Sequence, residues 1–164
     1  DLTVGDDLSL ISDSAVLKFG ADSVLVLVID GTFIIKGILS PKSAEAATRV
    51  GANGIIISNH GGRQLDSAPS SIEVLPQITN TINSEMTVML DSGIRYGADI
   101  VKAYASGASF VFSGRPFMFG IGALNEPGAE FVLNLMVNEV DKTLAQIGCK
   151  NIQDLDPGYI WHND

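Results

Sequence analysis

A run of nine residues carries side chains well suited to chemistry. It spans residues 58–66 and is Ser-Asn-His-Gly-Gly-Arg-Gln-Leu-Asp. His60 lies next to two glycines, where a backbone can approach a ligand closely, and a neutral histidine can act as a general base. Arg63 can bind a carboxylate through two parallel hydrogen bonds. Together the pair predicts a substrate that loses a proton near a carboxylate, although His60 alone is also compatible with a structural role in a loop.

A lysine and two glycine-containing turns add positive charge and accessible backbone amides. Lys36 ends an apolar run, where its ammonium could meet a buried anion or extend along the surface. Residues 91–95 (Asp-Ser-Gly-Ile-Arg) and 113–115 (Ser-Gly-Arg) resemble anion-binding turns, because glycine exposes N–H groups, arginine adds charge and a helix N-terminus is expected to follow. Asp91 is too close to such an anion to bind it and suits a polyol hydroxyl. Phosphate, polyol and a cationic lysine describe flavin mononucleotide (FMN) better than a simple phosphate ester.

Four short apolar runs, each followed by a helix-like stretch, must position these residues. The expected strands are 32–36, 54–58, 87–90 and 109–112, and the expected helices are 41–51, 71–82, about 100–107 and about 126–147. This alternation predicts an α/β fold with a parallel sheet covered by helices. Two architectures fit: a doubly wound open sheet, or part of a TIM-type (β/α)₈ barrel, of which a complete copy takes about 250 residues. In a barrel the carboxyl ends of all strands share one face, so the four clusters would converge there.

The first 31 residues have a different pattern. Residues 23–29 are strand-like, and Asp30-Gly31 before residues 32–34 is typical of a hairpin turn. No function follows from this segment, and a structural edge is the simplest interpretation.

Composition excludes several classes of protein. The chain has 164 residues, 46% hydrophobic and 18% charged, which does not describe a disordered protein. Its longest strictly apolar run is six residues, whereas a membrane-spanning helix needs about 20. The net charge of −9 argues against a nucleic-acid partner. Cys149 is the single cysteine, so neither an intramolecular disulfide nor a cysteine-based zinc site can form, and no metal-ligand spacing is present.

The chemical residues, in this order and spacing, resemble those of the FMN-dependent α-hydroxy acid dehydrogenases and oxidases. The run 58–66 is a long and specific signature, and Lys36-Gly37, the run 91–95 and Gly114-Arg115 fall in the family's order. The resemblance covers about residues 33–156 and implies the barrel architecture. Residues 141–149 look closest to the bacterial mandelate dehydrogenase branch.

The resemblance also implies roles for these residues. His60 would be the catalytic base, and His60 and Arg63 would contact the substrate, Arg63 through its carboxylate. The implied FMN contacts are Lys36 near the flavin N1 and O2, Ser58 on the flavin, Asp91 on the ribityl chain, and the turns containing Ser92, Gly93, Ile94, Arg95, Gly114 and Arg115 at the phosphate. The implied reaction oxidises an (S)-2-hydroxy acid of lactate, glycolate or mandelate type to a 2-oxo acid. His60 would remove either the hydroxyl proton or the α-proton.

Members of this family are about twice as long as this chain. We therefore expect residues 32–164 to form the C-terminal half of a barrel domain and residues 1–31 to match the family poorly. We expect the isolated chain to bind FMN weakly and to have little turnover. We also expect a homo-oligomer, located in the cytoplasm or peripherally on the inner face of a bacterial membrane. The electron acceptor could be oxygen, a quinone or a cytochrome. The alternatives are an inactive fragment of such an enzyme and another phosphate-binding barrel enzyme.

Overall fold

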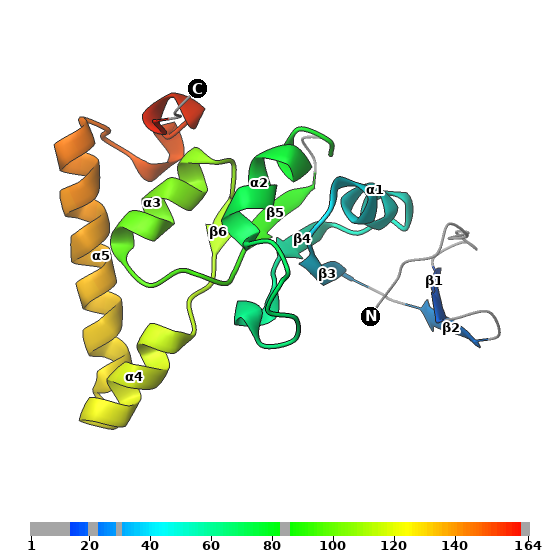
Figure 1. Ribbon diagram of the computed structural model, residues 1–164, viewed down its shortest axis with the longest axis horizontal. Helices are drawn as coiled ribbons and strands as arrows, with labels where there is room; N and C mark the ends of the chain where they lie inside the picture. The colour runs from blue at the N-terminus through cyan, green and yellow to red at the C-terminus, as the bar shows by residue number, and fades with distance from the viewer. Residues whose placement is uncertain (1–13, 20–22, 29–30, 83–85, 162–164) are drawn as a thin grey trace.

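A four-stranded parallel sheet forms the centre of the computed structural model, which describes residues 14–19, 23–28, 31–82 and 86–161 (Figure 1). The strands are β3 (Ile34–Ile38), β4 (Gly54–Ile57), β5 (Thr87–Leu90) and β6 (Phe110–Val111), and they lie in sequence order. Their parallel pairing places all four carboxyl ends at one edge of the sheet. A register shift between Lys36 and Ile38 interrupts the ladder at the end of β3.

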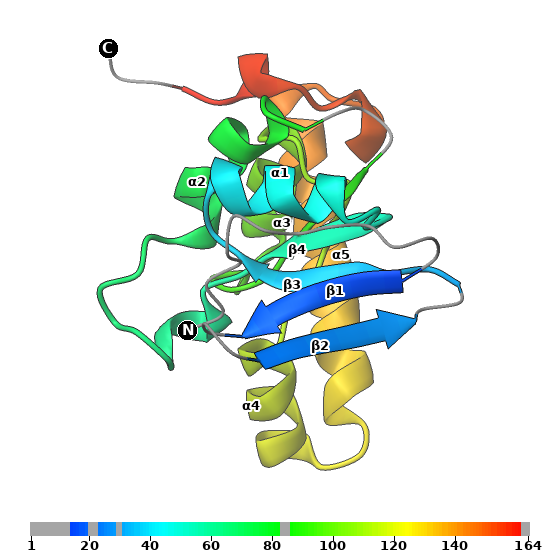
Figure 2. The ribbon, with the colours of Figure 1, turned by 90° about the vertical axis from the view of Figure 1, so that its right-hand side faces the viewer.

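Helices follow each strand, as a β/α barrel requires. They are α1 (Pro41–Arg49), α2 (Ser71–Thr79), α3 (Gly97–Ala105), α4 (Arg115–Leu124) and α5 (Gly128–Ile147). Three short 3₁₀ helices complete the set, namely η1 (His60–Gly62), η2 (Ile152–Asp154) and η3 (Pro157–Tyr159). Figure 2 shows α1, α2 and α3 on the same side of the sheet. Covering of one face favours part of a barrel over a doubly wound sheet, which carries helices on both faces.

Local capping explains where the helices begin and end. Ser40 accepts a hydrogen bond from the backbone N–H of Ser43 at the start of α1, and Pro41 occupies its first position. Ser70 and Glu73 form a capping box at the start of α2, and the hydrogen bonds from Ser70 hold the pKa of Glu73 below its usual value. At the end of α5, Gly148 takes a left-handed conformation with φ of 72°.

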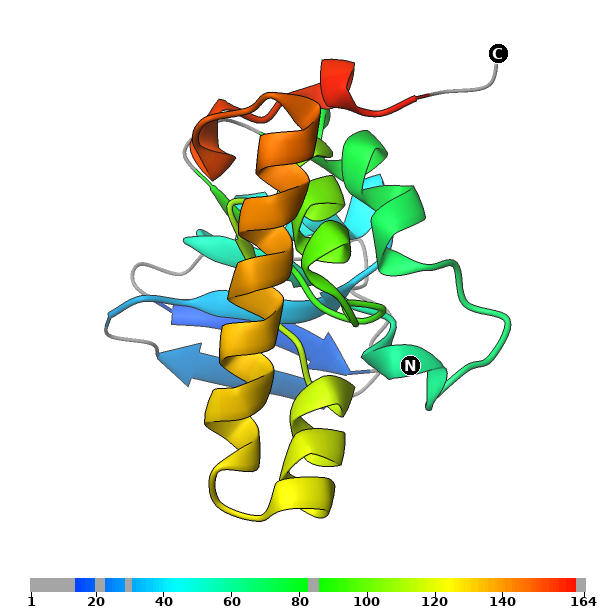
Figure 3. The same cartoon turned by 90° about the vertical axis from the view of Figure 1, so that its left-hand side faces the viewer.

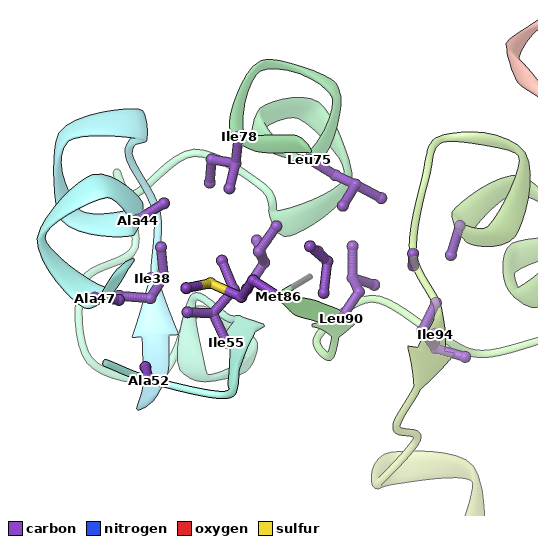
Figure 4. Close-up of a cluster of buried hydrophobic side chains, with 14 of the residues drawn as sticks. Ile38, Ala44, Ala47, Ala52, Ile55, Leu75, Ile78, Met86, Leu90 and Ile94 are labelled. Carbon is purple, nitrogen blue, oxygen red and sulfur yellow. The ribbon is translucent and has the colours of Figure 1, made fainter. Parts of the chain in front are cut away.

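The hydrophobic core lies between the sheet and α1, α2 and α3 (Figure 4). Ile55 and Leu90 point from the strands toward this core and are fully buried. Leu75 and Ile78 of α2 meet them from the helix layer and are also fully buried. Each such side chain contributes about 1.5–3 kcal/mol through removal of apolar surface from water. This packing fixes the strands and therefore the positions of their carboxyl ends at the edge of the sheet.

The opposite face of the sheet is open in the described part of the chain. The register places Lys36 beside Ile56, Ile56 beside Met89, and Met89 beside Phe110. Phe110 is half exposed and contacts Phe112 edge to face, with ring centroids 5.0 Å apart. In a complete barrel this face points into the interior.

The four predicted β/α units are confirmed, although most of the element boundaries differ by one to three residues. The first strand begins at Ile34 rather than at residue 32. Two helices follow β6 where one, at about residues 126–147, was expected: α4 begins directly after the turn at 113–115, and Asn125 (φ 58°) separates it from α5. The predicted hairpin at Asp30-Gly31 is wrong, because β2 (Ser23–Val28) pairs antiparallel with β1 (Ser14–Phe19), while the paired neighbour of β3 is β4. Asp30 itself lies outside the described residues.

Two glycines set the close packing of α4 against α5. A methyl group on Gly120 would lie 2.6 Å from the carbonyl oxygen of Gly128 and 2.5 Å from the side chain of Val132. The same modification of Gly128 would clash with the backbone of Gly120. Side chains at either position would push the helices apart.

We therefore expect Gly120→Ala to destabilise the protein by about 1–3 kcal/mol, the range typical of overpacking. Gly122→Ala is the matched control on the same helix, since nothing lies within 4 Å of a methyl group there. It should leave stability unchanged or raise it by about 0.5–1 kcal/mol, because alanine favours helix. Urea unfolding of both variants measures the difference, and equal midpoints would contradict this packing.

Candidate functional site

The carboxyl ends of the four strands open into one cleft of about 810 Å³. Ten of the eleven site residues predicted from the sequence line it: Lys36, His60, Arg63, Asp91, Ser92, Gly93, Ile94, Arg95, Gly114 and Arg115. Lys36 lies near the end of β3 and the others follow β4, β5 and β6. Their convergence is the arrangement that a barrel fold predicts.

Lys36 joins the ends of three strands through its ammonium group. The Nζ atom lies 2.6 Å from Oδ2 of Asp91, after β5, and donates a hydrogen bond of 2.8 Å to Oγ of Ser58, after β4. Ser92 donates a further hydrogen bond of 2.6 Å to Oδ1 of Asp91. From its sequence context Lys36 could either meet an anion or extend along the surface. Within the described residues, it pairs with the carboxylate of Asp91.

Asp91 is partly buried, and two opposing effects act on its carboxyl group. Burial alone would raise its pKa, but hydrogen bonds from Lys36, Ser58 and Ser92, together with the positive charge of Lys36, hold the pKa below its usual value. Asp91 is therefore ionised at neutral pH. It neutralises the charge of Lys36 without consuming all of that group's donors, because an ammonium has three N–H bonds and two are used here.

Ser58 is the one predicted site residue that does not line the cleft. It is fully buried, and its Oγ accepts hydrogen bonds from Lys36 and from the backbone N–H of His60, the latter at 3.1 Å. Ser58 therefore links the lysine to the loop that carries the histidine.

The loop after β4 forms η1 and turns sharply at His60 and Gly61, with φ of 56° and 69°. The backbone N–H of Gly61 donates to Oγ of Ser92 at 3.0 Å, and its carbonyl accepts from Nη2 of Arg115 at 2.7 Å. Asn59 closes the turn by accepting from the N–H of Gly62 at 3.2 Å. Contacts from β5 and α4 thus hold a loop that could otherwise adopt many conformations.

Three basic side chains in the cleft have no partner among the described residues and can meet a ligand. Within the described residues, the imidazole of His60 and the guanidinium groups of Arg63 and Arg95 make no hydrogen bond or ion pair. All three residues are exposed. A base and two cations without protein partners can act on a small anion that enters the cleft.

The turn at residues 91–95 differs from its predicted form in one respect. Gly93 (φ 84°) has open space around it, as an anion-binding turn requires. The first amides of α3 are not free, however, because Asp99 accepts hydrogen bonds from the N–H groups of Arg95 and Tyr96, and Glu139 accepts from Gly97. The prediction that this helix N-terminus faces an anion is therefore corrected, and carboxylates occupy it.

The second turn opens α4. Gly114 precedes the helix and also has open space around it, while Arg115 is its first residue. Ser113 donates a hydrogen bond of 2.9 Å to the carbonyl of Ile94 and so ties the two turns together. Here the helix N-terminus does face the cleft, in agreement with the sequence analysis.

Several residues that line the cleft were not among the predicted site residues: Gly61, Gln64, Phe112, Ser113, Met118 and Phe119. Gln64 and Ser113 belong to the runs 58–66 and 113–115, so the sequence pattern could have identified them as site residues. Met118 and Phe119 lie on α4 and are 70% and 69% exposed. Among the described residues no cluster of three His, Cys, Asp or Glu side chains could hold a metal ion. No helix of the described chain has the length and apolarity needed to cross a membrane.

Replacing Lys36 with methionine should raise the pKa of Asp91, because the desolvation remains while the ammonium is lost. In the wild type, the lowered pKa stabilises the fold above the unfolded-state pKa of about 3.9, and this contribution disappears as the pH falls through the folded-state pKa. Titration of the Asp91 carboxyl carbon by NMR measures the change. Lys142→Met, on the exposed side of α5, is the control and should leave the Asp91 titration unaltered. An unchanged pKa in Lys36→Met would contradict the ion pair.

Comparisons with known proteins agree with this geometry. The family model for FMN-dependent dehydrogenases matches residues 20–162, a range that begins inside the segment 1–31. A 2-hydroxyacid oxidase of Dictyostelium discoideum is 47% identical over 128 residues, which are 78% of this chain and 33% of that protein. The (S)-mandelate dehydrogenase of Pseudomonas putida is 47% identical over 127 residues, or 77% of this chain and 32% of that protein.

Solved structures show the same similarity. The crystal structure of the monotopic membrane protein (S)-mandelate dehydrogenase superimposes with a TM-score of 0.79 and 44% identity, over 83% of this chain and 36% of that one. A mandelate oxidase structure gives a TM-score of 0.73 and 40% identity over 78% of this chain and 40% of that one. The chain spans about a third of the length of the curated relatives it matches. Its parallel sheet and helices are part of a TIM-type barrel, and the chain belongs to the FMN-dependent dehydrogenase family.

Proposed function

We propose that residues 32–164 form the C-terminal half of the barrel of an FMN-dependent oxidoreductase that converts an (S)-2-hydroxy acid to a 2-oxo acid. The observation that carries this proposal is the cleft itself. It combines a paired lysine, a free histidine and arginine, and two open glycine turns in a chain of this family. Relatives named for 2-hydroxyacid, lactate and mandelate oxidation support the substrate class.

The residues present fit FMN. Gly93 and Gly114 leave space that a side chain would fill, and Arg95 and Arg115 supply cations beside them, which suits a phosphate. Lys36 keeps one N–H donor for the flavin side of the cleft. Asp91, Ser92 and Ile94 line the same wall of the cleft. Asp91 would accept a hydrogen bond from the ribityl chain. Ser58 does not line the cleft and would act on the flavin through its hydrogen bond with Lys36. Bound FMN would supply the two-electron acceptor.

His60 and Arg63 would act on the substrate. Arg63 would hold the carboxylate through paired hydrogen bonds and so fix the position of the adjacent carbon. The neutral imidazole of His60 would accept the hydroxyl proton as the substrate loses two electrons and two protons in total. The backbone N–H of His60 already donates to Ser58, which holds the base at a fixed position relative to Lys36.

Partners and location follow the same proposal. Oxidases and dehydrogenases both occur among the relatives. The comparisons therefore support oxidation of the substrate but do not distinguish between electron acceptors. We propose that the chain assembles as a homo-oligomer. A membrane-associated relative supports a peripheral location on the inner face of a bacterial membrane as an alternative to the cytoplasm.

The test of cofactor binding is an absorption titration of the purified chain with FMN. Binding with flavin bands shifted from those of free FMN is the expected result, and the open cleft predicts a weaker complex than a full barrel would give. Arg115→Ala should weaken this binding by about tenfold or more, because a charge-assisted contact is lost. Absence of any spectral change would contradict the proposal for this chain and favour an inactive fragment. Binding of other phosphate esters in preference to FMN would favour a different barrel enzyme.

Substitutions separate the roles of the base and the carboxylate ligand. His60→Gln should lower kcat by about 10²–10⁴-fold, as expected for loss of general base catalysis, while FMN binding persists. Arg63→Lys keeps the charge but loses the paired geometry, so KM for the 2-hydroxy acid should rise more than kcat falls. Dye reduction with lactate, glycolate and mandelate measures both. Equal kcat values for wild type and His60→Gln would remove His60 from the mechanism.

A further inference from the structure

Helix α5 contacts both helices that follow the two glycine turns of the cleft. Figure 3 shows it extending along α3 at one end and α4 at the other, and Figure 1 shows the same arrangement from a second direction. The proposed catalytic roles make no use of α5, and none of its residues lines the cleft. Its position therefore calls for a different explanation.

Glu139 makes the polar contact with α3, beside the apolar packing of Val101 of α3 against Val140 and Leu144 of α5. Its Oε2 atom accepts a hydrogen bond of 2.6 Å from the backbone N–H of Gly97, the first residue of α3. A methyl group on Gly97 would lie 2.5 Å from both the Cβ atom of Glu139 and the backbone nitrogen of Val140. The two helices therefore approach closely at Gly97, and the carboxylate replaces the missing hydrogen-bond partner of a helical N-terminus.

This contact extends directly to the first glycine turn. Asp99, in the first turn of α3, accepts hydrogen bonds of 2.9 Å and 3.0 Å from the N–H groups of Arg95 and Tyr96. The turn is thereby fixed to α3, and Glu139 fixes α3 to α5. Gly93 lies two residues before Arg95, so its position depends on the same chain of contacts.

The second glycine turn is attached to the other end of α5. Gly114 and Arg115 begin α4, and α4 packs on α5 through Gly120 and Gly128 without intervening side chains. One rigid helix of 20 residues therefore connects the supports of both turns. A phosphate held between the turns would be sensitive to their separation, because charge-assisted hydrogen bonds depend closely on distance.

We propose that Glu139 is a positioning residue for the phosphate of the cofactor: by fixing α3 to α5, it acts together with the direct hydrogen bond from Ser113 to Ile94 to set the separation between the turn containing Gly93 and the turn containing Gly114. The inference rests on the proposed binding of FMN. It assigns a role in ligand recognition to a residue that lies outside the cleft and does not touch the ligand.

Riboflavin provides the discriminating probe, since it shares the ring and ribityl chain of FMN but lacks the phosphate. Glu139→Ala should weaken FMN binding by about tenfold, as for loss of a hydrogen bond to a charged group, and leave riboflavin binding unchanged. Glu139→Gln retains an acceptor oxygen and should recover most of the FMN affinity. Asp141→Ala removes a carboxylate from the exposed part of the same helix and should bind both flavins as wild type does. Equal weakening of both flavins, or unchanged FMN binding, would overturn the proposal.

A second measurement needs no ligand and separates this inference from the proposed function. In amide NMR spectra of the ligand-free chain, Glu139→Ala should shift the resonances of Gly93 and Gly114 as well as that of Gly97, whereas Asp141→Ala should not. Shifts confined to Gly97 and its neighbours in α3 would overturn the role of Glu139 even if FMN binds. If the shifts occur but wild type binds no FMN, the proposed function fails and the structural connection through α5 stands.

Discussion

The contact between Lys36 and Asp91 is the interaction on which the cleft depends. A cation and a carboxylate at the ends of β3 and β5 lie 2.6 Å apart, and the buried Ser58 after β4 completes the connection. Burial of Asp91 would be unfavourable without this partner, since desolvation raises the pKa of a carboxyl group. The ion pair thus allows β3, β4 and β5 to end in polar groups that lie together at the same edge of the sheet. Through Ser58 and Ser92 it also fixes the loop that carries His60.

The polar residues of the cleft divide into two groups. Lys36, Asp91, Ser92 and Arg115 are hydrogen-bonded to one another or to the backbone, and together they define the walls. His60, Arg63 and Arg95 lack partners within the described residues and project from those walls. A binding site profits from this division, because fixed groups preorganise the site while free groups keep their capacity for the ligand.

The sequence was informative wherever the relevant signal was local. Apolar runs predicted the strands, and the expected helix start at residue 41 and helix end at residue 147 agree with α1 and α5. Strand order then placed the four clusters together, because parallel strands share one edge. Contacts between distant segments left no such signal. Arg115 and Gly61 are 54 residues apart, and Glu139 and Gly97 are 42 apart, so neither pair could be found from residue type and spacing. The residue roles carried over from the family resemblance remain proposals.

Two residues of the cleft have backbone conformations that suit glycine better than themselves. His60 has φ of 56° and Ser92 has φ of 72°, in the left-handed region where a side chain costs about 1–2 kcal/mol. Replacement by glycine would relieve this cost at both positions. At Ser92 glycine would also remove the hydroxyl that bonds Asp91 and Gly61, so those two hydrogen bonds offset the backbone cost there. At His60 no side-chain hydrogen bond within the described residues offsets it. Selection for thermal stability alone would therefore act against the proposed base and not against Ser92.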